Sequence, residues 1–166
     1  MFDRQGLSLV DVRLWRHAEC RQGMKDMLGV VPGVMAWGLV TGVAMVKAGM
    51  PPPIALLMAL TVFAASAQLA SVPLMLSGAP IWVVWVTAWC VNLRFVIFSA
   101  HMRRHMMALP LRWRLVAGYL TADITYVFMQ QRHGQSAPAD AQNIGPLAYF
   151  VGLCSVNWLA WNVSAT

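Results

Sequence analysis

The sequence predicts an all-α polytopic membrane protein with about five membrane segments, the second of them broken or re-entrant. Of the 166 residues, 59% are hydrophobic and 11% are charged, and the mean hydropathy is +0.60. A water-soluble core cannot hide so much apolar surface in so short a chain, whereas helices that cross a bilayer expose it to lipid. The net charge of +6 does not indicate a nucleic-acid partner, because the basic residues lie in the N-terminal segment and in loops, as in cytoplasmic membrane loops.

Residues 1–26 are predicted to form a cytoplasmic or interfacial segment, followed by a transmembrane domain at 27–166. Apolar residues at positions 7, 10, 14 and 18 recur every three or four residues, and Ser8 and Asp11 suit a helix start. We expect a short helix on the membrane surface, with a solvated leader as the alternative.

The first membrane span is predicted at about Leu28 to Val46. Its glycines at 29 and 33, and at 38 and 42, form two pairs of the small-xxx-small type. Such pairs let neighbouring helices approach closely, so we interpret them as packing positions.

The second apolar run, 54–76, follows three prolines and is interrupted in its middle. Small and polar residues fill positions 64–71, and Pro73 follows them. This composition is typical of a membrane helix that unwinds to expose its backbone to a cavity, although close packing would favour it equally.

Three further segments are predicted downstream. The third span, about 81–100, precedes a basic loop, and the fourth covers about 115–129. A polar linker then leads to a fifth run, which begins near Pro146.

The distribution of Lys and Arg tests this topology. Five simple crossings with a cytoplasmic N-terminus would leave six of them inside and five outside, which is almost no bias. If the second segment re-enters instead of crossing, nine lie inside and two outside, in accord with the positive-inside rule. We therefore favour the re-entrant hairpin.

Polar residues within the apolar segments are the candidate functional residues, because a charged group at bilayer depth is costly unless it faces protein or water. They are Ser66, Gln68, Asn92, Arg94, Thr121 and Asp123. Together they suit a zwitterion, with the carboxylate at Arg94 or at the N-terminus of a half-helix, and the ammonium at Asp123 or at backbone carbonyls. The alternative is an ion pair between Arg94 and Asp123 that only holds two helices together.

No constellation of catalytic residues is visible, so we expect neither an enzyme nor a cofactor. His101 and His105 are four residues apart, but a membrane metal site needs more ligands than the chain offers. We interpret both as interfacial residues.

The order of five motifs resembles the AzlC family over about residues 21–166. These motifs are GVVPGVMAWGLVTG, FAASAQLAS, SGAP, VNLRFVIFSAHMRRH and YLTADITYVF. The resemblance implies the larger subunit of an exporter in the inner membrane, which releases branched-chain amino acids alongside a small AzlD-like membrane subunit. It implies roles in the transport pathway for Gln68, Asn92, Arg94 and Asp123.

Two departures from the family pattern are visible. Ala65 stands where the family often has Gly, and the chain stops at WNVSAT where the pattern continues through further helices. We therefore expect a membrane domain that is incomplete at its C-terminus. The leading hypothesis is secondary transport coupled to protons through Asp123, and the alternative is a non-transporting membrane scaffold or assembly subunit.

Overall fold

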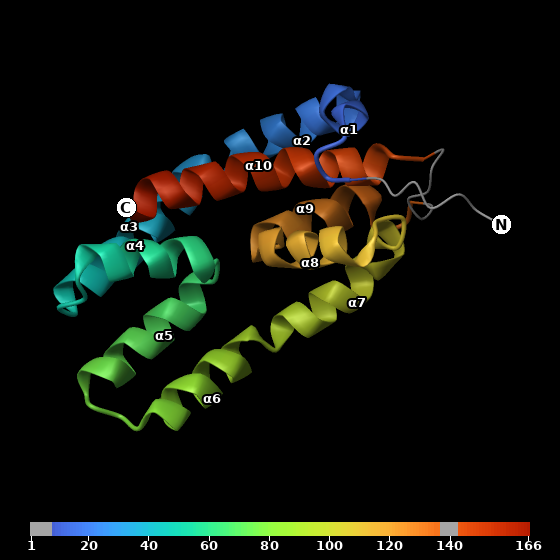
Figure 1. Ribbon diagram of the computed structural model, residues 1–166. Helices are drawn as coiled ribbons and strands as arrows, with labels where there is room; N and C mark the ends of the chain where they lie inside the picture. Colours follow the sequence, from blue (N-terminus) through green and yellow to red (C-terminus); the bar gives the residue numbers. More distant parts are fainter. Residues whose placement is uncertain (1–7, 137–142) are drawn as a thin grey trace. The chain divides into compact units, whose positions relative to one another are not determined.

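The computed structural model describes residues 8–136 and 143–166, and the regular elements of this part of the chain are all helices (Figure 1). The predicted all-α class is therefore confirmed. The helices are α1 (Val12–Arg16), α2 (Ala18–Leu28), α3 (Val31–Lys47), α4 (Pro52–Thr61), α5 (Ala65–Leu76), α6 (Ile81–Asn92), α7 (Arg94–Met106), α8 (Leu111–Leu120), α9 (Asp123–His133) and α10 (Gly145–Ala165).

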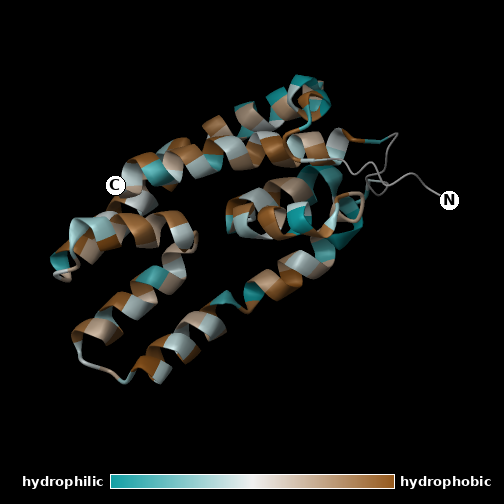
Figure 2. Ribbon diagram, viewed as in Figure 1, coloured by the Kyte–Doolittle hydropathy of each residue, from teal (hydrophilic) through white to brown (hydrophobic). Residues whose placement is uncertain are grey.

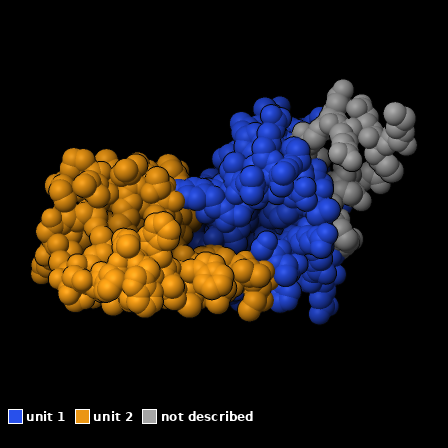
Figure 3. Space-filling view, turned by 60° about the horizontal axis from the view of Figure 1, so that its bottom comes forward, with its two compact units in different colours: residues 1–30, 98–157 blue, residues 31–97, 158–166 orange. Residues whose placement is uncertain are grey.

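The helices group into two compact units, coloured separately in Figure 3. The first unit comprises residues 1–30 and 98–157, and the second comprises residues 31–97 and 158–166. Helices α7 and α10 therefore contribute residues to both. The predicted domain boundary after residue 26 stays a prediction.

Local sequence signals set where the helices begin. The carboxylate of Asp11 accepts a hydrogen bond from the backbone N–H of Arg13 at 2.9 Å, so Asp11 caps α1. Of the predicted helix-starting pair, Asp11 is therefore confirmed, whereas Ser8 lies before the helix and bonds Asp11 through its backbone carbonyl. Helices α4, α6 and α8 each begin directly after a proline, at Pro51, Pro80 and Pro110. The fixed φ of proline suits the residue that leads into a helix.

The second apolar run is broken, as predicted. Helix α4 ends at Thr61 and α5 begins at Ala65, with Val62 and Ala64 in non-helical conformations (φ −109° and −150°, both with ψ 84°). The chain turns back at this break, and α5 then packs against α6 (Figure 1).

The predicted fourth span, 115–129, is not one helix. Helix α8 ends at Leu120 and α9 begins at Asp123, with Ala122 extended at φ −114° and ψ 166°. The physical reason is local: the hydroxyl of Thr125 accepts from the N–H of Ala122 and donates to its carbonyl, both at 2.8 Å. Side chains that bond the backbone in this way compete with the helical ladder.

The core of the first unit surrounds the start of α10, where Leu147, Phe150 and Leu153 are fully buried. Two glycines bring α2 and α10 together. A Cβ on Gly23 would collide with the backbone carbonyl of Tyr149, and one on Gly152 with that of Cys20.

The core of the second unit contains Met45, Ala59 and Trp161. A Cβ on Gly42 would lie 2.6 Å from the carbonyl oxygen of Ala165, and one on Gly38 would meet Trp161 and Ser164. The close packing predicted for this glycine pair is confirmed. Gly33, from the other predicted pair, faces open space.

One helical stretch in the described part, Ile81–Met106, is long and apolar enough to cross a membrane by itself. Only 6% of its apolar window is buried, unlike the core helix of a soluble protein, and hydrophobic residues recur along it in Figure 2. Helices α2 and α3, separated by a short break, pass the same length and composition test as a pair. The described residues thus contain one or two candidate spans, and the five predicted segments stay unconfirmed.

Tryptophans form a stripe on α6. Trp82, Trp85 and Trp89 are 65%, 72% and 68% exposed, and their spacing of three and four residues places them on one face of the helix. This face is uncovered by any described part of the chain.

Candidate functional site

Ser66 and Arg94, which are 28 residues apart in the sequence, contact each other in the second unit. Ser66 lies in the first turn of α5, and Arg94 is the first residue of α7, directly after the interruption at Leu93. A terminal nitrogen of Arg94 donates a hydrogen bond to the Ser66 hydroxyl. The guanidinium carbon also lies 5.2 Å from the centre of the Phe95 ring. The contact joins two places where helices are interrupted.

Gln68 is fully buried between α4 and α5. Its Nε2 donates to the carbonyl oxygen of Met58 at 3.1 Å, which fixes the orientation of the amide because a carbonyl needs a donor. Its Oε1 has no hydrogen-bond partner among the described residues. A buried acceptor without a partner is costly to maintain, and such groups in a native protein often mark a site for a ligand or water.

Asn92 is the last residue of α6 and is half-buried. Its Oδ1 is a second buried amide oxygen without a partner in the described chain. Asn92 precedes Arg94 by two residues, so the same helix interruption carries an acceptor and a cation.

The electrostatic character of this region follows from these groups. Helix α5 has no side-chain cap at its N-terminus, so its first N–H groups and the Arg94 guanidinium form a positive end. The amide oxygens of Gln68 and Asn92 are acceptors. Donors for an anion and acceptors for a cation are therefore present in one unit, as a zwitterionic ligand requires.

A separate groove of about 690 Å³ lies in the same unit. Its walls are mostly apolar and come from the end of α3, the start of α4 and the end of α10, with Lys47 and Ser164 among its polar residues. None of the predicted site residues lines it.

Thr121 and Asp123 belong to the first unit. The Thr121 hydroxyl donates to the carbonyl oxygen of Ala117 at 2.7 Å. Asp123 is the exposed first residue of α9, where the helix dipole favours a carboxylate. The structure therefore groups four of the predicted residues in one unit and these two in the other. The predicted ion pair between Arg94 and Asp123 would join the units and stays a prediction.

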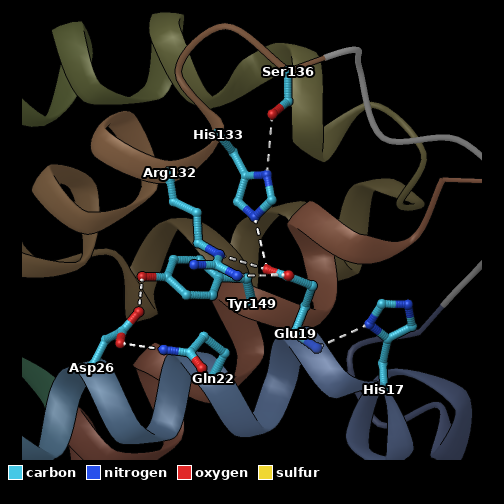
Figure 4. Close-up of polar contacts among 8 residues, drawn as sticks. All are labelled: His17, Glu19, Gln22, Asp26, Arg132, His133, Ser136 and Tyr149. Atoms are coloured by element: carbon cyan, nitrogen blue, oxygen red, sulfur yellow. Dashed lines mark hydrogen bonds and ion pairs between the residues drawn. The ribbon is translucent and has the colours of Figure 1, made fainter.

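A polar cluster in the first unit was missed by sequence reasoning (Figure 4). Arg132 on α9 donates to both carboxylate oxygens of Glu19 on α2, at 2.8 and 2.9 Å. The Nε2 of His133 lies 3.2 Å from the same carboxylate. The hydrogen bonds from Arg132 lower the pKa of Glu19 against a smaller opposing effect of burial, and the nearby His133 lowers it further.

The same cluster extends to α10. The Tyr149 hydroxyl donates to Asp26 at 2.7 Å, and Gln22 donates to the other carboxylate oxygen at 2.7 Å. The guanidinium of Arg132 lies 5.2 Å from the centre of the Tyr149 ring. The only sequence signal was the presence of acidic residues in an otherwise basic leader, which does not identify a partner 113 residues away.

The histidines predicted as interfacial have partners on other helices or neighbouring arginines. The Nδ1 of His101 lies 2.6 Å from the Tyr126 hydroxyl, and the Phe98 ring stacks on that tyrosine at 4.1 Å. His105 is 2% exposed and accepts from Arg104 at 3.2 Å. The contacts of His101 and Phe98 with Tyr126 join α7 to α9 within the first unit.

Comparison with known proteins identifies a family. The sequence model of a family described as AzlC protein matches residues 29–166. A search of curated proteins and a search of solved structures found no match. The family is associated with transport, not with enzymes, and it indicates a membrane protein involved in branched-chain amino-acid transport. Because the match covers most of the sequence, the chain belongs to the AzlC family.

Proposed function

We propose that this chain is a subunit of a secondary transporter that exports valine, leucine, isoleucine or similar small apolar amino acids. The observation that carries the proposal is the break between α4 and α5. There the fully buried Gln68 holds an unpartnered amide oxygen, and Ser66 at the helix start bonds Arg94 from α7. Family membership supports the substrate class.

In this proposal each part of the substrate has a matching group. The N-terminus of α5 and Arg94 receive the carboxylate, and the amide oxygen of Gln68 receives the ammonium. Met58 and Phe63, which pack at the break, supply apolar surface for a branched side chain. A zwitterionic amino acid has no net charge, so its binding here adds no net charge to the bilayer.

The length and depth of α4 and α5 support a re-entrant hairpin. Their 10 and 12 residues rise about 15 and 18 Å, whereas the hydrocarbon core is about 30 Å thick. Phe63 at the break packs edge-on against Trp161 at 6.0 Å, and the Trp161 carbonyl lies against Gly38. Gly38 precedes Lys47, in the last turn of α3, by nine residues or about 14 Å. With Lys47 at the membrane surface, this distance puts Gly38, and with it the break between α4 and α5, near the middle of the hydrocarbon core.

The remaining parts of the proposal concern coupling and partners. Asp123 carries the proton that drives export, because it is the carboxylate at the second helix break. A small AzlD-like membrane subunit completes the transporter in the inner membrane, with the N-terminus of this chain in the cytoplasm. The density of Lys and Arg in the leader supports that orientation.

A second candidate function follows from the Ser66–Arg94 contact alone. Polar contacts of this kind hold membrane helices together, so the chain would also suit a non-transporting scaffold or assembly subunit. A scaffold predicts that Gln68→Ala and Arg94→Ala change assembly or stability without changing substrate preference.

Efflux of labelled valine tests the proposal. Cells loaded with a valine dipeptide would express the chain with and without an AzlD-like subunit, and an Arg94→Ala variant with confirmed membrane insertion serves as the control. We expect efflux that requires the partner and fails in the variant. Efflux that never exceeds that of empty cells, despite insertion, would refute branched-chain export.

A further inference from the structure

The two ends of the helix pair α8/α9 lie close together in the first unit. Helix α7 ends at Met106, and α8 begins five residues later at Leu111. Arg104, in the last turn of α7, donates to the carbonyl oxygen of His133, the last residue of α9, at 3.3 Å. The end of α9 therefore lies close to the end of α7, from which the chain leads into α8.

Contacts with α10 give the depth of the break between them. Helix α10 starts at Gly145, where a Cβ would lie 3.6 Å from the Cγ of Glu19. Nine residues farther along, or about 14 Å, the thiol of Cys154 donates to the carbonyl oxygen of Leu120 at 3.4 Å. Leu120 is the last residue of α8, so the break lies about half the thickness of a bilayer core from the start of α10.

The break itself is polar. Thr125, which is fully buried, bonds both backbone groups of Ala122, and the Thr121 hydroxyl bonds a carbonyl in α8. Non-helical backbone at membrane depth is tolerated only where protein covers it or where it lines water. The exposed Asp123 at the same point indicates water.

We propose that α8 and α9 form a re-entrant hairpin that enters the bilayer from the cytoplasmic face, and that Thr121–Asp123 at its tip is a polar site reached by water-soluble molecules from that face. If α8 and α9 together crossed the membrane, Arg132 would lie on the other side of the membrane from the N-terminal leader. Yet Arg132 forms a two-fold hydrogen-bonded ion pair with Glu19 in that leader. The hairpin removes this conflict.

The charge distribution agrees with the hairpin more closely than with any arrangement of crossings considered from the sequence. The leader, the loop at 103–114 and Arg132 then share one face, which carries ten of the twelve Lys and Arg residues. Lys47 is alone on the other face, and Arg94 lies within a span. Positively charged residues concentrate on the cytoplasmic side in this way.

The resulting topology has three crossings and two hairpins. In this proposal the crossings are the stretch of α6 and α7, which passes the length and composition test by itself, α3, which passes it together with α2, and α10, whose 21 residues rise about 31 Å. Each hairpin lies within one of the two units, α4/α5 in the second and α8/α9 in the first. This inference concerns sidedness and water access, so it goes beyond the proposed transport activity and does not depend on it.

Labelling of introduced cysteines, one in each variant, with a membrane-impermeant maleimide tests the proposal. The background carries Cys90→Ala, because Cys90 is exposed while Cys20 and Cys154 are buried. Gln135→Cys probes the residue stretch after α9, Met107→Cys the turn before α8, and Ser77→Cys the turn after α5, all at exposed positions. Ala122→Cys and Thr121→Cys probe the tip, and the unsubstituted background is the control.

We expect Gln135→Cys, Met107→Cys and both tip variants to react only in inside-out vesicles, and Ser77→Cys to react only in right-side-out vesicles. Labelling of Gln135→Cys from the side of Ser77→Cys would show that α8 and α9 cross, and would overturn the hairpin. Failure of both tip variants to react from the cytoplasmic side would overturn the water-accessible site. Because labelling needs no substrate, these outcomes are distinct from a failure of valine export.

Discussion

The helix pairs α4/α5 and α8/α9 share a backbone plan and differ in how their breaks are satisfied. Each pair begins after a proline, contains helices of 10 to 12 residues and is interrupted by two or three residues. The break before α5 has no side-chain cap, and the buried Gln68 beside it holds an unpartnered oxygen. The break before α9 is closed by the hydroxyl of Thr125 and carries the carboxylate of Asp123.

This difference suggests a division of roles. A break whose polar groups lack internal partners gains free energy when a ligand supplies them, whereas a break closed by its own side chains does not. We therefore expect the break in α4/α5 to act mainly by contacting the ligand, and the break in α8/α9 to act mainly through the charge of Asp123. The following substitutions test that division, beginning with the largest expected effect.

Replacement of Asp123 by Asn should abolish export driven by the proton gradient. The variant cannot release or take up a proton at the α8/α9 break, although its volume and position at the helix start are nearly unchanged. Valine efflux measured over a range of imposed pH gradients checks this. Asp26→Asn is the matched control, because Asp26 is also a carboxylate but lies in the α2/α10 cluster. Normal gradient-dependent efflux from Asp123→Asn would show that proton coupling does not need the carboxylate at this break.

Replacement of Gln68 by Leu should raise the valine concentration needed for half-maximal transport by roughly tenfold to a hundredfold. Loss of a hydrogen bond to a charged group costs about 1.5–3 kcal/mol, and 1.4 kcal/mol corresponds to a factor of ten. The Met58 carbonyl keeps its backbone partner, Val62, so the end of α4 remains bonded. Ser71→Ala, at a buried position on the same helix, is the control. An unchanged concentration dependence would mean that the unpartnered oxygen does not face substrate.

Replacement of Thr125 by Val should lower the free energy of unfolding by about 1–3 kcal/mol, because the N–H of Ala122 loses its bond to a fully buried hydroxyl, whereas the Ala122 carbonyl keeps its bond from the N–H of Tyr126. Ser66→Ala, at the other break, should have a smaller effect on stability. Thermal unfolding of both variants in detergent measures the difference. Equal losses would indicate that the two breaks are held in the same way.

The smallest effect concerns the end of α9 and its response to pH. Arg132 lowers the pKa of Glu19 in the folded protein, so Glu19 contributes stability above its ordinary pKa of 4.5 and this contribution is lost as the pH falls through the lowered value. Both side chains are partly exposed, so the contribution is about 1 kcal/mol or less. Unfolding measured between pH 7 and 3 should show a loss in the parent protein that is reduced in Glu19→Gln. Identical pH profiles of the parent protein and the variant would show that the ion pair between Glu19 and Arg132 does not stabilise the end of α9.

Sequence reasoning located the first break and missed the second for a physical reason. At 64–71 a cluster of small residues, Gln68 and a following proline together indicate unwinding. At 115–129 the apolar residues continue, and a threonine within a helix is usually accommodated by bonding the preceding turn, as Thr121 indeed does with Ala117. The bonds from Thr125 that hold Ala122 extended have no distinct sequence pattern.

Long-range pairing was likewise beyond the sequence. The glycine pairs at 29/33 and 38/42 look alike, yet only the second lies against α10. The pattern of polar residues does not show that Ser66 bonds Arg94 or that Glu19 bonds Arg132. Such contacts depend on how helices pack, and hydropathy does not specify the packing.

The tryptophan stripe of α6 offers an optical measure of immersion. Trp82, Trp85 and Trp89 succeed one another along a single exposed face, at increments of about 4.5 and 6 Å along the helix axis. In variants that retain one of these three indoles and replace the other tryptophans by phenylalanine, emission would shift to shorter wavelength as the ring leaves water. Quenching by lipids brominated at different acyl carbons would then rank the three rings by distance from the bilayer centre, and so give the direction in which α6 runs through the hydrocarbon.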